Sequence, residues 1–237
     1  QPTKSPLLSC DGESLSALRV SLSDHAAGMD LSFDSSGENE LVAGLRAIVG
    51  TDHVYTGADS LQSFYLKGAR LGSGTALAVV CPGTLQEAVA ALQLIARAGA
   101  VVVPQGANTG LTGGSVPKSS ADKYGGRECV VVNMRRIDGI HTLHEHDGIR
   151  YLCLAGAGIH TLSCLAKDQG RESHSILGST FLNPTVAAGL AFGSGGTQMR
   201  KGPVFTERAL WASKYLHALS VPHIKQRARC GREINAV

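Results

Sequence analysis

An apolar run that passes directly into a glycine-rich loop constrains the fold of this chain more than any other segment. Residues 101–117 read VVVPQGANTGLTGGSVP, so three β-branched residues precede a loop with four glycines, two threonines, an asparagine and a serine. β-Branched residues favour a buried strand, and glycine lets the backbone approach a ligand closely or adopt a positive φ angle. Main-chain N–H groups in such a loop can bind phosphate oxygens, and short hydroxyl side chains add further donors. The segment therefore predicts a strand that ends in a site for a phosphorylated ligand.

The residues of the loop leave a simpler alternative open, because Gly, Asn, Thr and Ser are also the residues of ordinary surface turns. The loop lacks the Gly-Lys-Ser or Gly-Lys-Thr ending of a P-loop. It also lacks the G-x-G-x-x-G spacing that opens a helix in dinucleotide-binding folds. Spacing by itself does not decide between a phosphate site and a structural turn.

Hydrophobic patterning around the loop predicts a small α/β lobe. Residues 76–81 form a compact apolar strand, and residues 84–98 form a helix that begins with a capping box between Thr84 and Glu87. Together with the strand at 101–104 they make a strand–helix–strand crossover of about 30 residues.

Further elements are expected on both sides of this unit. An amphipathic helix should precede it and a third apolar strand should follow it. Beyond that strand the pattern changes to an antiparallel hairpin and two helices. The expected ranges are 38–49 (helix), 129–133 (strand), 137–143 with 151–155 (hairpin), 159–169 and 185–192 (helices).

Several segments resemble one enzyme superfamily. Residues 104–115, PQGANTGLTGGS, are similar to the pyrophosphate-binding loop of the FAD-linked oxidases of the vanillyl-alcohol-oxidase and p-cresol-methylhydroxylase (PCMH) type. Further similar segments follow the family order from about residue 41 to residue 210. Within the superfamily, the segments most resemble the quinone-dependent D-lactate dehydrogenases. The further matching segments are 65–74, 76–84, 170–179, 194–196 and 200–207.

The resemblance implies FAD as the cofactor and assigns residues to it. One group would hold the pyrophosphate and part of the ribityl chain: Gly106, Ala107, Asn108, Thr109, Gly110, Gly114 and Ser115. A second group would flank the cofactor, with a hydroxyl donor from its threonine: Gly178, Thr185 and Gly195. His174 is interpreted as a structural residue beside the isoalloxazine ring, and FAD is expected to bind without a covalent bond. No catalytic residue is assigned.

The same resemblance implies an α+β fold of the PCMH type, with a small βαβ lobe followed by a mixed or antiparallel lobe. Residues 1–36 are expected to be a disordered leader, 37–211 the FAD-binding domain and 212–237 a divergent tail. The chain is interpreted as an N-terminal portion, truncated before the catalytic half.

The expected function is FAD-dependent oxidation of D-lactate to pyruvate with electron transfer to quinone. In the complete enzyme the partners would be a 2-hydroxy acid and quinone. Two alternatives stay open: another FAD-linked 2-hydroxy-acid dehydrogenase or oxidase of the superfamily, or a non-catalytic FAD-binding remnant.

Composition limits the other possibilities. A net charge of +3 gives no argument for nucleic acid or a membrane surface. Six cysteines without C-x-x-C spacing indicate neither a disulfide framework nor a zinc site, and no metal is expected. These features suggest a cytoplasmic protein, with peripheral contact to the inner membrane only in the complete enzyme.

Overall fold

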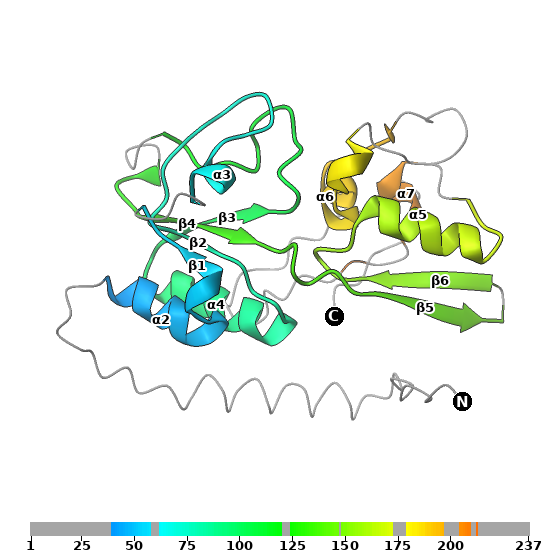
Figure 1. Cartoon of the computed structure of the whole chain (residues 1–237), viewed down its shortest axis with the longest axis horizontal. Helices are drawn as coiled ribbons and strands as arrows, with labels where there is room; N and C mark the ends of the chain where they lie inside the picture. Colours follow the sequence, from blue (N-terminus) through cyan, green and yellow to red (C-terminus); the bar gives the residue numbers. More distant parts are fainter. Residues whose placement is uncertain are drawn as a thin grey trace. The chain divides into compact units, whose positions relative to one another are not determined.

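The computed structural model describes seven parts of the chain (Figure 1): residues 39–57, 62–119, 124–146, 148–172, 179–196, 204–209 and 212. The expected leader at 1–36 lies outside the described residues, as does the expected tail except for Ala212.

A four-stranded sheet forms the first part of the fold. Its strands are β1 (Val54–Tyr55), β2 (Ala78–Val80), β4 (Cys129–Asn133) and β3 (Val101–Gln105), in that spatial order. β1 is antiparallel to β2, whereas β2, β4 and β3 run parallel. The predicted strand–helix–strand unit is confirmed as β2, α4 (Leu85–Arg97) and β3. Its two strands are not neighbours, because β4 is inserted between them.

Side chains predicted from the local sequence or seen in the structure cap the N-termini of two helices in this part of the fold. The hydroxyl of Thr84 accepts a hydrogen bond from the Glu87 N–H at 3.1 Å, as the capping box predicts. The Glu87 carboxylate accepts from the N–H of Gly83 at 2.7 Å, one residue before the cap itself. Asn39 caps α2 (Glu40–Val49) by accepting from the Leu41 N–H at 3.0 Å.

Both faces of the central strands β2 and β4 are buried. Helices α2 and α4 lie on one side, and the short helix α3 (Gln62–Leu66) lies on the other (Figure 1). Alternate residues of the strands point to opposite faces, so Val80 and Val132 pack with α2 and α4, while Val79 and Val131 pack with Tyr65. All five residues of β4 are buried, as expected for the central strand of a covered parallel sheet.

The second part begins with the predicted hairpin, formed by β5 (Ile140–Glu145) and β6 (Gly148–Cys153). The two predicted helices follow as α5 (Ile159–Asp168) and α6 (Val186–Ala191). Between these helices lies η3 (Thr180–Leu182).

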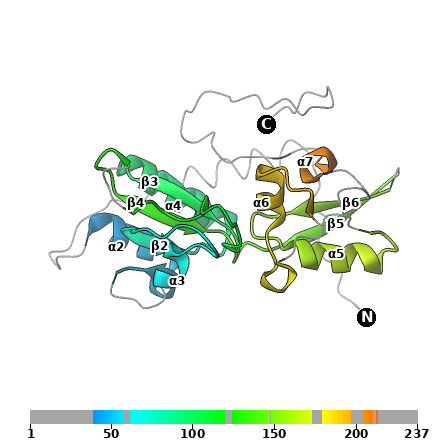
Figure 2. The same ribbon diagram turned by 90° about the horizontal axis from the view of Figure 1, so that it is seen from above.

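Main-chain hydrogen bonds join the starts of α5 and α6. The N–H of Ile159 donates to the Pro184 carbonyl, and that of Val186 donates to the Ala157 carbonyl, both at 2.8 Å. Helix α7 (Phe205–Arg208) lies beside α6 (Figure 2), where the Phe205 ring packs against Gly189. None of the helices in the described parts is long and apolar enough to cross a bilayer.

Candidate functional site

Two buried amides meet at the carboxyl edge of the parallel sheet. Gln105 ends β3 and Asn133 ends β4, and the strand register pairs them directly. The two residues are only 2% and 3% exposed. The Asn133 Nδ2 donates to the Gln105 Oε1 at 2.9 Å. Ligands of open parallel sheets bind at this edge, so the pair lies at the base of a candidate site.

This amide pair ties both ends of the glycine-rich loop to the sheet. The Gln105 Nε2 donates to the carbonyl of Ser115 at 2.8 Å and to that of Tyr65 at 2.9 Å. The Asn133 Nδ2 also donates to the Gly106 carbonyl at 3.0 Å. Since both buried amides are fully used, the network stabilises the loop instead of leaving unpaired polar groups.

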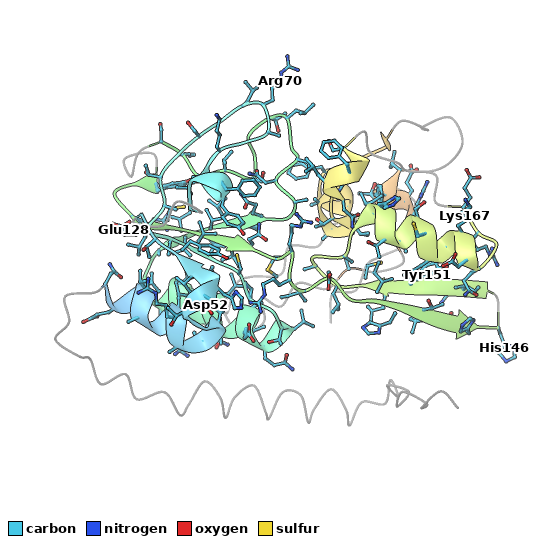
Figure 3. All side chains as sticks on the ribbon, in the orientation of Figure 1. Asp52, Arg70, Glu128, His146, Tyr151 and Lys167 are labelled. Carbon is cyan, nitrogen blue, oxygen red and sulfur yellow. The ribbon has the colours of Figure 1, made fainter. Side chains whose placement is uncertain are left out.

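A turn between α3 and β2 packs against the outer side of the loop. Gly113 has a φ of 72°, and a Cβ there would lie 2.8 Å from the Leu71 carbonyl oxygen. A Cβ at Gly72, whose φ is 88°, would lie 3.4 Å from the Gly113 Cα. Both positions favour glycine, because a side chain would be strained at these positive φ angles, and at Gly113 it would also collide with the Leu71 backbone. Arg70, in the same turn, points away from the loop (Figure 3).

The start of the loop offers main-chain donors. From Gly106 to Gly110, no N–H group donates to an acceptor in the described part of the chain. Residues 106–109 are half-buried and Gly110 is exposed, so a ligand outside the protein can reach these five donors. A Cβ at Gly110 would meet nothing within 4 Å, which leaves room for that ligand. Free donors beside open space fit the diphosphate of a dinucleotide.

A cavity of about 230 Å³ adjoins this segment. Besides the loop and the two buried amides, aromatic, sulfur-containing and cationic side chains line this cavity. The rings of Tyr55 and Tyr65 stack with centroids 5.5 Å apart, and Phe64 meets Tyr65 edge-on. The lining residues are Tyr55, Phe64, Tyr65, Cys81, Gln105, Gly106, Ala107, Asn108, Asn133, Arg135 and Arg136.

Burial changes the pKa of two side chains that line the cavity, Tyr65 and Cys81. Burial raises the pKa of the Tyr65 hydroxyl, and the neighbouring Cys81 raises it further. Burial also raises the pKa of the Cys81 thiol, although the hydrogen bond from Tyr65 and the charge of Arg136 partly oppose that effect. Both shifts of pKa favour the protonated, uncharged forms of these two groups. The Arg136 Nη1 donates to the Cys81 carbonyl at 2.7 Å and adds positive charge.

The expected cofactor residues of the first group form one continuous loop. Thr185, from the second group, lies against its start, because a Cβ at Gly106 would be 2.7 Å from the Thr185 Oγ1. That hydroxyl accepts from the Ala188 N–H at 3.2 Å and so caps α6. Gly195 is half-buried and lies two residues beyond the turn that follows α6. Gly178 and His174 lie outside the described residues.

Sequence reasoning missed the Gln105–Asn133 pair. The signal was present, since VVVPQ and CVVVN each end an apolar strand with an amide side chain. The histidines of the hairpin take no part in this site, and the described residues contain no group of three His, Cys, Asp or Glu placed to hold a metal ion.

Comparison with known proteins gives a family and named relatives. The family model described as "FAD binding domain" matches residues 76–206. The quinone-dependent D-lactate dehydrogenase of Corynebacterium glutamicum is 42% identical over 175 residues, which are 73% of this chain and 29% of that protein. The enzyme of the same name from Escherichia coli is 37% identical over 168 residues, 71% of this chain and 28% of the relative. The chain thus spans about 30% of the length of these relatives.

Solved structures agree on the fold. An alkyldihydroxyacetonephosphate synthase aligns with a TM-score of 0.61 and 21% identity, covering 76% of this chain and 35% of that one. p-Cresol methylhydroxylase aligns with a TM-score of 0.52 and 14% identity, covering 68% and 30%. The expected PCMH-type α+β fold is therefore confirmed.

Proposed function

The chain belongs to the family of FAD-binding domains, and from this premise we propose that it is the cofactor-binding portion of an FAD-dependent D-lactate dehydrogenase. The unused main-chain N–H groups from Gly106 to Gly110 are the observation that carries the proposal. The sequence similarity to quinone-dependent D-lactate dehydrogenases supports the substrate.

In this proposal the loop binds the pyrophosphate of FAD. Two phosphates at neutral pH need several short donors in one place, and backbone N–H groups supply them without a buried lysine. Arg135 and Arg136 in the adjoining cavity raise the local positive potential. Gly114 and Ser115 continue the same binding surface, and Thr185, Gly178 and Gly195 are assigned to the remainder of the cofactor.

FAD, when bound, would supply the redox chemistry as the acceptor of a hydride equivalent from the hydroxyl-bearing carbon of a 2-hydroxy acid. D-Lactate would give pyruvate, and the electrons would pass to quinone. Tyr65 and Cys81 keep their protons and line the cavity. The groups that bind the substrate carboxylate and take its hydroxyl proton are assigned to the portion of the relatives that this chain does not match.

Quinones dissolve in lipid, so we place the complete enzyme in the cytoplasm with peripheral contact to the inner membrane. The quinone dependence in the relatives' names supports this placement.

Titration of the purified 237-residue chain with FAD tests the cofactor assignment. Saturable binding at one FAD per chain is expected, with riboflavin binding much more weakly because it lacks the phosphates. Equal affinity for both ligands, or no binding, would contradict the assignment to the loop.

The substrate assignment needs a second measurement. D-Lactate should bleach the flavin absorbance anaerobically in the complete enzyme, and L-lactate serves as the control. Bleaching by a different 2-hydroxy acid, and not by D-lactate, would contradict the substrate assignment. It would favour another 2-hydroxy-acid dehydrogenase or oxidase of the superfamily.

A further inference from the structure

Asn108 and Ser115 face each other across the glycine-rich loop and use their side chains within the protein. The Ser115 hydroxyl donates to the Asn108 Oδ1 at 2.8 Å. The Asn108 Nδ2 donates to the Lys67 carbonyl at 2.8 Å. A serine hydroxyl carries a single hydrogen, so the donor of Ser115 is already committed to Asn108.

The backbone of Asn108 has an unusual conformation, with a φ of 53°. Asparagine is among the few residues other than glycine that adopt this left-handed region readily. Alternation between right- and left-handed residues turns successive N–H groups toward one point and forms an anion-binding concavity. The two side-chain hydrogen bonds of Asn108 hold this residue between Ser115 and Lys67.

Ser115 is fixed a second time through its main chain, because its carbonyl accepts from the buried Gln105 Nε2 at 2.8 Å. The Gln105–Asn133 pair and the Asn108–Ser115 hydrogen bond therefore both restrain the loop at Ser115. A loop restrained by both sets of hydrogen bonds has its conformation before any ligand arrives, which lowers the conformational entropy lost on binding.

We propose that Asn108 and Ser115 are positioning residues, whose side chains shape the loop for the FAD pyrophosphate without donating to it. This inference rests on the proposed function. It means that the phosphates are recognised by main-chain N–H groups, and that the two side chains act as one unit.

A double-mutant cycle on the FAD dissociation constant of the 237-residue chain tests the proposal. The variants are Ser115→Ala, Asn108→Gly and the double variant; glycine at 108 retains access to the positive φ angle. Loss of the Asn108–Ser115 hydrogen bond should give about a tenfold weaker Kd in Ser115→Ala. Asn108→Gly also loses the hydrogen bond to Lys67 and should weaken binding at least as much. The double variant should bind FAD no more weakly than Asn108→Gly alone, since one bond joins the two side chains.

Two further variants separate positioning from a general structural role. Ser115→Thr keeps a hydroxyl at this position, unlike Ser115→Ala, and should therefore retain most of the FAD affinity. Thr84→Ala removes a hydroxyl that caps α4, outside the cavity lining. It should lower the thermal midpoint of the ligand-free chain and leave the Kd unchanged.

Losses that multiply to about 100-fold in the double variant would overturn the proposal, because independent phosphate contacts add in free energy. An unchanged Kd in Ser115→Ala would overturn it as well. If the unmodified chain bound FAD and the losses multiplied, only this proposal would fail. Absence of FAD binding in the unmodified chain would defeat the proposed function and this inference together.

Discussion

The side chain of Thr185 lies directly against Gly106, so that a Cβ on Gly106 would be 2.7 Å from the Thr185 Oγ1 and 3.0 Å from its Cγ2. Thr185 is 2% exposed and caps α6, while Gly106 begins the glycine-rich loop after β3. The contact joins the start of the loop to the start of a helix far along the chain. Glycine is therefore needed at 106 for packing, independently of any ligand.

Gly106→Ala should lower the free energy of unfolding by about 1–3 kcal/mol, the usual cost of overpacking a buried contact. Urea unfolding measures this loss. A second change, Thr185→Ser, removes the methyl group at 3.0 Å and keeps the capping hydroxyl, so it should restore part of the stability. Gly110→Ala is the matched control, because its Cβ would meet nothing within 4 Å. Equal losses in the two alanine variants would contradict the packing argument.

Gly110→Val and Gly114→Val should abolish flavin retention while leaving the fold intact. A Cβ at Gly110 meets no protein atom within 4 Å, and one at Gly114 meets the Phe192 ring at 3.8 Å, an ordinary contact. A β-branched side chain would instead occupy the approach of the phosphates. Flavin content after gel filtration measures the effect, and thermal melting without FAD checks the fold. Full flavin occupancy in both variants would show that the loop does not hold the pyrophosphate.

Asn133→Leu should cost at least about 2 kcal/mol of unfolding free energy, because buried groups that lose their only partner retain the full desolvation penalty. The change removes the partners of the Gln105 Oε1, the Gly106 carbonyl and the Arg135 N–H. Asn39→Ala is the matched control: it removes an amide that only caps α2 and should cost about 1 kcal/mol. Chemical denaturation compares the two. A loss in Asn133→Leu no larger than in the control would mean that the buried network contributes little.

Stability should fall as the solution becomes strongly alkaline. Burial raises the pKa of the Cys153 thiol from 9.0 to about 11. Between these values the unfolded chain releases the proton and the folded chain keeps it. The contribution of this group is therefore complete below pH 9 and is lost as the pH rises toward about 11.

Denaturation midpoints across this pH range measure the decline, which Cys153→Ala should make shallower. Some decline should remain, because burial also raises the pKa of Cys81 and Cys129. An identical slope with and without Cys153 would contradict the linkage.

Much of the local structure could be predicted because its signals are local. The Thr84 cap, the apolar strands and the hairpin each depend on neighbouring residues, and each was found close to its expected range. The position of β4 between β2 and β3 could not be predicted, since strand order depends on pairing between distant segments. The same limit hid the Gln105–Asn133 pair, whose contact exists only once β3 and β4 align.

The sequence alone determined that an apolar strand runs into a glycine-rich loop, and its resemblance to a flavin-binding family led to the prediction that the loop binds FAD. Only the tertiary structure decided how that loop is held. Gln105, Asn133, Asn108 and Ser115 bond across the loop and the sheet, and Thr185 closes against Gly106 from another part of the chain. The physical reason is distance along the chain: glycine content and β-branching act on nearby residues, whereas these contacts form only when separate segments pack together.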